Sequence, residues 1–156
     1  MPDLYELIGS LLMLGFVFLW VGPAASRTVW RTLEVPPPPT IPTNRDIVRP
    51  KTPTPIYPYW ALRRGQVGWV LVDVRISEDG RYLDHEIVAE APEGMFGKTV
   101  TKALKQTTYR SHSGFPLPGR IKTLYKFVVP ARDGSVPAWA VTVPGLVVEG
   151  TRGLLD

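Results

Sequence analysis

Proline is concentrated in one part of this 156-residue chain, which restricts where a folded domain can form. Ten of the seventeen prolines lie between Pro23 and Pro58. The same stretch has no sustained apolar periodicity, so it cannot bury enough surface to offset the entropy lost on ordering. Closely spaced prolines favour the extended polyproline II conformation instead. We therefore expect an extended spacer over residues 27–55, with the packable core beginning near Tyr57.

An uncharged stretch precedes this spacer. No residue between Glu6 and Arg27 carries a charge. About 20 such residues, at about 1.5 Å each, reach the roughly 30 Å thickness of a bilayer's hydrocarbon core. We predict a short N-terminal segment over residues 1–6 and a single transmembrane helix over residues 7–26. A cleaved signal peptide is the alternative, but this stretch is longer than a usual signal core and follows acidic residues.

Two further features bear on this predicted membrane helix. Gly9, Ser10 and Gly15 provide small surfaces on which other membrane helices could pack closely, which would place the lipid bilayer and neighbouring membrane subunits among the partners. Arg27 and Arg31 follow the helix, and no basic residue precedes it. The positive-inside rule taken alone would therefore leave the following domain in the cytoplasm.

Composition excludes several kinds of chemistry. The chain has no cysteine, which removes disulfides, thiolate metal sites and thiol nucleophiles together. Its formal net charge is +4, and a mildly basic chain suits anionic lipid, an acidic partner or nucleic acid about equally. The length allows one modest domain with appendages.

Periodicity predicts the secondary structure of the second half. From Gln66 the chain alternates as a strand, and Asp79-Gly80 is typical of a tight hairpin turn before a second strand over about residues 82–89. One face of the first strand carries Val70, Val72, Val74 and Ile76. The pair is expected to be antiparallel.

The next segment has the longer period of hydrophobic residues that is typical of a helix. Residues 95–109 place apolar side chains on one stripe and lysines opposite, which predicts an amphipathic helix of about four turns. Residues 120–129 alternate again and predict a third strand. A short helical turn, "PYWALRRG", is expected before the first strand and should end at Gly65. The fold class is thus α+β: a small antiparallel three-stranded sheet packed on one long helix.

These elements resemble the C-terminal domain of TonB-type energy transducers. The matching stretches are "YPYWALRRGQVGWVLVDVRISEDGR", "IVAEAPEGMFGKTVTKALKQTTYR" and "GFPLPGRIKTLYKFVV", which together cover residues 56–130. One membrane anchor, a proline-rich spacer that crosses the periplasm and this terminal domain are also the architecture of the family. The resemblance implies a bacterial inner-membrane protein whose C-terminal domain is periplasmic.

The resemblance also implies a function in transport and protein binding. An extended peptide of a partner protein would add as a strand to the third strand of the sheet, while the membrane helix relays motion from proton-channel proteins. The partner-binding residues implied in this way are Tyr57, Pro58, Leu124, Tyr125, Lys126, Phe127 and Val128.

The chain departs from the family in two places. Family members that use the proton gradient resemble one another in a Ser-x-x-x-His pattern in the membrane helix, whereas here Ser10 is followed four residues later by Leu14. Residues 131–156 are additional, with apolar stretches around Trp139 and Val147. They are expected to form an extra edge strand, a flap over the sheet, or a docking arm for a permanent partner. The alternative function is a non-energised structural subunit of a large membrane complex, respiratory or photosynthetic, in which the TonB-like domain is a docking clamp.

No constellation for catalysis emerges, so we expect no enzyme activity and no cofactor. Strand alternation places Asp84 and Glu86 on the face opposite His85, so these three side chains are not expected to share a metal ion. His112 lies in a loop without a neighbouring acid. The helix lysines indicate a solvated face, because the aromatic interleaving typical of single-strand binders is absent; we expect no nucleic-acid partner.

Overall fold

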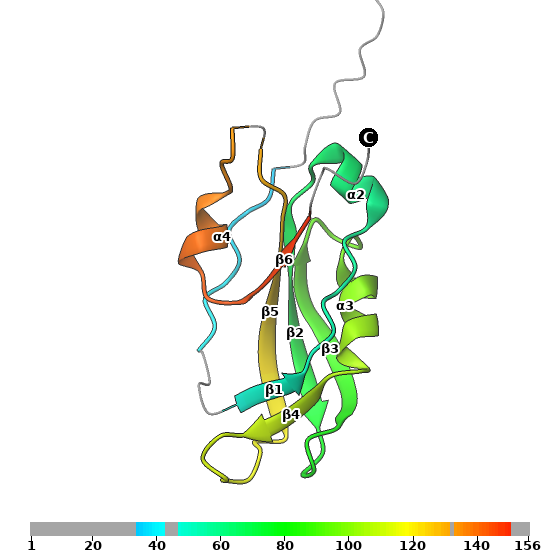
Figure 1. Ribbon diagram of the computed structural model, residues 1–156, viewed down its shortest axis with the longest axis vertical. Coiled ribbons are helices and arrows are strands. Elements are labelled where there is room, and N and C mark those ends of the chain that lie inside the picture. Colours follow the sequence, from blue (N-terminus) through cyan, green and yellow to red (C-terminus); the bar gives the residue numbers. More distant parts are fainter. Residues whose placement is uncertain (1–33, 43–46, 132, 151–156) are drawn as a thin grey trace, which may run out of the picture.

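The structure, a computed structural model, describes residues 34–42, 47–131 and 133–150. Short helices separate single strands or pairs of strands along this part of the chain (Figure 1). Their order is β1 (Ile47–Lys51), α2 (Tyr59–Arg64), β2 (Gly68–Ile76), β3 (Tyr82–Ala91), α3 (Gly97–Leu104), β4 (Thr108–Ser111), β5 (Arg120–Val128), α4 (Ala138–Thr142) and β6 (Leu146–Glu149).

The main sheet has four strands in the order β3-β2-β5-β6. β2 is antiparallel to both β3 and β5, as predicted, but β6 runs parallel to β5. β1 and β4 form a separate antiparallel pair. The prediction of a three-stranded antiparallel sheet is therefore incomplete. The C-terminal extension adds β6 to the main sheet as a fourth strand, and the predicted spacer contributes β1 to the separate pair.

The predicted buried face of β2 is confirmed. Val70, Val72 and Val74 are fully buried, and they share a core with Val100 and Leu104 of α3. Aromatic rings from other elements complete this layer, because Phe96 and Phe127 stack with their centroids 4.3 Å apart. Alternation along β2 thus places one apolar row against the apolar stripe of α3.

Two glycines shape the connections as the sequence predicts. Gly65 ends α2 in the left-handed conformation, with φ of 63°. Gly80 has φ of 81° in the turn between β2 and β3. A Cβ atom at Gly80 would lie 2.0 Å from the carbonyl oxygen of Tyr109, so this turn requires glycine both for its backbone conformation and for the close approach of β4.

The helix predicted over residues 95–109 is shorter in the structure, where α3 spans Gly97–Leu104. The last part of the predicted range belongs to β4, which pairs with β1. Tyr109 points from β4 into the core and is only 2% exposed. β-branched and aromatic residues favour a strand where a partner strand is available, and the partner here is β1, which the proline pattern did not indicate.

The second face of the sheet is also covered. Trp69, Leu71 and Leu124 form an apolar cluster on this face, with Trp139 of α4 packed over them. Residues 34–42 join this cluster, and the Trp69 indole Nε1 donates a hydrogen bond to the carbonyl oxygen of Pro36 at 2.8 Å. The folded unit therefore extends beyond residues 56–130 at both ends, because parts of the predicted spacer and of the extension pack on it.

The predicted membrane helix over residues 7–26 and the segment 1–6 lie outside the described residues. The helix-packing residues Gly9, Ser10 and Gly15 lie there too. Within the residues that the structure does describe, none of the helices has the length and apolar character needed to cross a membrane.

Candidate protein-interaction edge

The strand predicted to receive a partner, β5, has neighbours on both sides. β2 pairs with it along its length, from Gly68 opposite Phe127 to Arg75 opposite Arg120. β6 pairs with its other side, from Leu146 opposite Tyr125 to Glu149 opposite Val128. The edge of β5 is thus closed over residues 125–128 by β6, and a peptide added there would first have to displace β6.

β6 is tied into the fold by more than its ladder. Val148 is 2% exposed and belongs to the core shared with α3. The backbone N–H of Gly150 donates to the carbonyl oxygen of Val128 at 2.8 Å. Where the chain enters β6, a Cβ at Gly145 would lie 2.9 Å from the carbonyl oxygen of Leu124, so a glycine permits this close approach.

The side chains predicted to bind a partner are mostly buried. Leu124, Tyr125, Phe127 and Val128 of β5 are each at most 5% exposed. Tyr57 is 8% exposed and its hydroxyl donates to the carbonyl oxygen of Gln66 at 2.5 Å. These side chains serve the core, and partner binding by the β5 edge remains a prediction that would have to act through its backbone.

Tyr57 and Pro58 have separate structural roles. The ring of Tyr57 meets Phe96 and Phe127 edge-to-face, with centroids 5.6 and 5.5 Å away. Pro58 is the N-cap residue of α2, and its carbonyl oxygen accepts from the N–H of Leu62 at 2.9 Å. The family resemblance implied that both residues bind a partner, whereas the structure places Tyr57 in the core and Pro58 half-buried at the surface.

Lys126 has an unusual position for a charged residue, because it is 3% exposed. Its ammonium Nζ donates to the carbonyl oxygens of Ala140 and Val143, each at 2.6 Å. These carbonyls lie at the C-terminal end of α4, where backbone acceptors lack helical partners and a cation is favourable. Burial lowers the pKa of Lys126. The residue therefore anchors α4 over the sheet.

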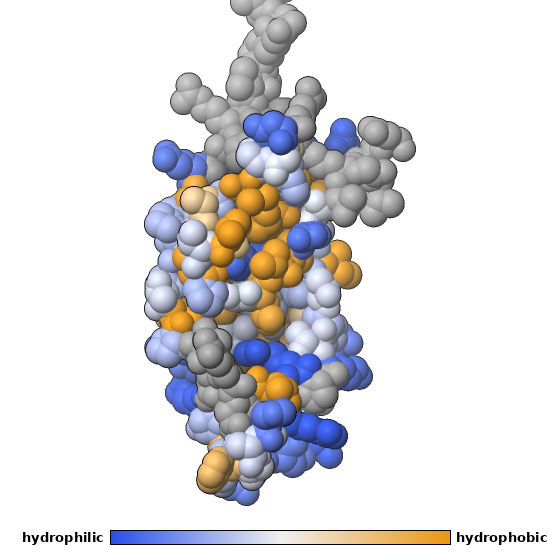
Figure 2. Space-filling model, turned by 60° about the vertical axis from the view of Figure 1, so that its left-hand side comes forward, coloured by the Kyte–Doolittle hydropathy of each residue, from blue (hydrophilic) through white to orange (hydrophobic). Residues whose placement is uncertain are grey.

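The open edges of the sheet are β3 and β6, its two outer strands in the described part of the chain. The β6 edge carries an exposed apolar side chain, because Val147 is 47% exposed, and Val141 of the preceding helix α4 is 76% exposed. Figure 2 shows apolar side chains gathered on this side of the molecule. Sequence reasoning named the apolar stretch around Val147 but could not place it, because an edge strand and a flap have the same local pattern.

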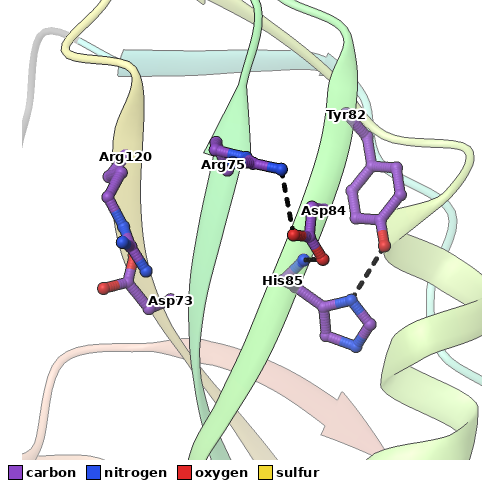
Figure 3. A network of polar contacts seen from close by, with 6 residues as sticks. All are labelled: Asp73, Arg75, Tyr82, Asp84, His85 and Arg120. Carbon is purple, nitrogen blue, oxygen red and sulfur yellow. Dashed lines mark hydrogen bonds and ion pairs between the residues drawn. The ribbon is translucent and has the colours of Figure 1, made fainter.

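Ion pairs and hydrogen bonds connect neighbouring strands at the end of the sheet that contains Arg75 and Arg120 (Figure 3). Arg75 pairs with Asp84 at 3.1 Å and Arg120 with Asp73 at 3.3 Å. His85 points the other way from Asp84: its Nδ1 lies 2.8 Å from the hydroxyl of Tyr82, and its Nε2 lies 2.8 Å from Oγ1 of Thr101. The predicted separation of His85 from its neighbouring acid is confirmed.

This polar end carries no metal-binding geometry within the described residues. There, no group of three or more histidine, aspartate or glutamate side chains is placed to hold a metal ion. The ion pairs are largely exposed, and such pairs contribute about 0–1 kcal/mol each. The arrangement links β2, β3, β5 and α3.

Comparison with known proteins finds a family match for the central part of the chain. The family "Gram-negative bacterial TonB protein C-terminal" matches residues 53–128. Residues 53–128 are thus similar to the TonB C-terminal family. A solved structure, the solution NMR structure of Pseudomonas aeruginosa TonB CTD, is 27% identical, covers 55% of this chain and 86% of that chain, and has a TM-score of 0.42. No curated protein matches the chain.

The TonB C-terminal match ends at residue 128, which is the last residue of β5. α4 and β6, which cover the second face and the β5 edge, lie outside the matched range. The domain is a TonB-like protein-interaction module, and its candidate interaction edge is built by residues beyond the family match.

Proposed function

We propose that the chain is a membrane-anchored, periplasmic protein-interaction module of TonB type that binds an extended partner segment by strand addition at the outer edge of β6. The observation that carries this proposal is the open backbone edge of Leu146–Glu149, which carries the exposed side chain of Val147. An added strand would satisfy backbone groups of β6, and its alternate side chains would contact the apolar surface.

The β6 edge is a more accessible site than the β5 edge. Displacing β6 would expose Val148 and break the Gly150–Val128 hydrogen bond, whereas addition to its outer side breaks no ladder of the described residues. An unpaired apolar edge presents free backbone N–H and C=O groups with which another chain can pair. We therefore place the partner one strand further out than the family resemblance implies.

The anchor would tether the domain to an inner-membrane complex. The stretch between Glu6 and Arg27 has no ionisable side chain, and buried ionisable groups are the usual mark of proton work in a membrane. Ser10 and Leu14 stand where the family pattern has serine and histidine. These observations support tethering more than coupling to a proton channel.

A structural subunit of a large membrane complex is the second candidate function. The observation that favours it is the closure of the β5 edge over residues 125–128, together with the cover of α4 and residues 34–42 over the second face. A module that exchanges partners at β5 would need that edge open, whereas a permanent clamp would not. A respiratory or photosynthetic assembly would then be the partner.

Site-specific photo-crosslinking tests the proposed edge. A photoreactive phenylalanine analogue is placed at Val147 in the full chain in cells, and crosslinked proteins are identified by mass spectrometry. We expect one dominant partner from this position, and we expect Val147→Lys to remove that partner from the purified complex. The control is the same analogue at Phe115, which is 73% exposed in the loop before β5.

The outcomes separate the proposals. Equal crosslinking from positions 115 and 147, or retention of the partner by Val147→Lys, would contradict strand addition at β6. A stoichiometric set of membrane subunits that survives collapse of the proton gradient supports the structural role. A proton channel with an outer-membrane receptor supports coupling.

A further inference from the structure

A groove lies on the other side of the molecule, between the extended segment of residues 53–58, the start of α2 and one side of α3. Its volume is about 530 Å³. α3 packs on the opposite face of the sheet from α4, so this groove is separate from the β6 edge. It has a defined wall, because Oγ1 of Thr99 on α3 donates to the carbonyl oxygen of Ile56 at 2.5 Å.

The groove has an apolar lining that is left open to solvent. Ile56 is 79% exposed and Trp60 is 45% exposed, and Met95 lines the same groove. Contiguous exposed apolar side chains bordered by polar ones commonly mark interaction sites. Pro53 and Pro58 also line it, so the backbone on this side has limited freedom and the shape is largely pre-formed.

The charged side chains that line the groove are all positive. Lys98 and Lys102 line it from positions four residues apart on α3, so they lie on the same face of the helix. No acidic residue is among the lining side chains, and neither lysine forms an ion pair with a described residue. The guanidinium of Arg64 lies 5.6 Å from the ring of Trp60, which is one of the lining side chains.

We propose that this groove binds an acidic, apolar segment of a partner protein. Apolar side chains of the segment contact Ile56, Trp60 and Met95, while its carboxylates pair with Lys98 and Lys102. Partial burial in the groove would make these pairs stronger than ordinary surface pairs. The groove is concave, which suits a protein segment better than the flat surface of a bilayer.

This site is a second interaction surface, and it does not depend on strand addition at β6. The function proposed above needs one partner edge; a groove on the opposite face would let the domain hold a second segment at the same time. Loss of the β6 partner in Val147→Lys would leave the groove unchanged, so the two proposals fail independently.

Selection from a random peptide library displayed on phage tests the groove without assuming a partner. The full chain in a neutral detergent is the bait. We expect enriched peptides to combine carboxylates with apolar residues. Their affinity should fall at least about tenfold for the Lys98→Glu/Lys102→Glu double variant, which corresponds to about 1.4 kcal/mol of binding free energy. Trp60→Ala should also weaken binding.

A matched control lies on the same helix. Lys105 is exposed at the C-terminal end of α3 and does not line the groove, so Lys105→Glu should leave peptide binding unchanged. Replacing the carboxylates of an enriched peptide by lysine should restore binding to the double variant. Because Lys98 and Lys102 are exposed, their variants are expected to keep the wild-type circular dichroism spectrum.

Three results would overturn the proposal. The first is enrichment of peptides without carboxylates, or of none. The second is equal weakening by Lys105→Glu, which would indicate general electrostatics instead of a site. The third is displacement of the peptides by phosphatidylglycerol vesicles but not by phosphatidylcholine vesicles, with the same dependence on Lys98 and Lys102, which would assign the groove to an anionic membrane surface.

Discussion

Lys126 shows how strongly a single residue can depend on its surroundings. It lies in a strand that looks half-exposed by its alternation, yet its ammonium group is enclosed and bonded to two carbonyl oxygens of α4 and its C-cap. A lysine is rarely buried in this way unless its charge is satisfied. Here the acceptors are backbone dipoles, and no carboxylate forms an ion pair with Lys126 in the described residues.

Replacing Lys126 by methionine keeps the aliphatic volume but leaves the carbonyls of Ala140 and Val143 without this donor. We expect the free energy of unfolding to fall by about 2 kcal/mol, since a hydrogen bond to a charged group contributes about 1.5–3 kcal/mol and relief of lysine desolvation offsets part of the loss. Urea denaturation measures the change. No loss of stability would mean that α4 is held by its apolar contacts alone.

The same substitution gives a pH prediction. Burial lowers the pKa of Lys126 below its ordinary value of 10.5, so in the alkaline interval between the two values the unfolded chain binds more protons than the folded one. Stability attributable to this residue should therefore rise as the pH increases through that interval. The stability of the wild type relative to Lys126→Met, measured by urea denaturation at increasing pH, should grow there and stay constant at lower pH.

At the scale of elements, β6 forms the outer edge of the main sheet next to β5. It has four residues and alternates between the core and the surface: Val148 is 2% exposed, whereas Val147 is 47% exposed. One face of this short strand therefore fixes it to the fold, and the other borders the proposed interaction edge. Its stability and its availability to a partner depend on different residues.

Val148→Ala and Val147→Ala form a matched pair that separates these two properties. Val148→Ala should lower the free energy of unfolding by about 2 kcal/mol through lost burial and a residual cavity, and Val147→Ala by less than about 0.5 kcal/mol. Hydrogen exchange gives a second measurement: β5 amides that bond to β6 should exchange faster in Val148→Ala only. Equal effects of the two variants would mean that β6 is not seated as the structure shows.

At the scale of the whole molecule, the domain is closed on both faces. Many two-layer α+β domains have one sheet face covered by helices, but here α4 and residues 34–42 cover the second face as well. The indole of Trp69 connects these layers, because its ring lies in the cluster and its N–H bonds to Pro36. The segments flanking the TonB C-terminal match are thus part of the stable unit.

A chain that ends at residue 130 should demonstrate this dependence. It loses α4 and β6 and exposes Trp69, Leu124 and Val128, so we expect a lower unfolding temperature and strong binding of a hydrophobic dye such as ANS. A chain that ends at residue 150 keeps both elements and serves as the control. Wild-type thermal unfolding in the shorter chain would show that the extension is only attached to the domain.

The sequence by itself determined the features that depend on neighbouring residues. Alternation identified the buried row of β2, positive-φ glycines marked the turn at Gly80 and the end of α2 at Gly65, and the order of motifs identified the TonB C-terminal resemblance. Each of these follows from local sterics or from a repeat of two or about 3.6 residues. These local signals do not depend on which strand or helix packs against the segment.

Only the tertiary structure decided which segments pair over long separations. The structure pairs β6 with β5. It shows that Lys126, which was predicted to contact a partner, holds α4 instead. It also shows that the last residues of the predicted long helix form β4, which pairs with β1. An apolar four-residue stretch has the same local preference whether it pairs inside the chain, caps a face or binds another protein. The choice depends on the burial and backbone hydrogen bonds that each pairing gains, and these exist only once the whole chain is folded.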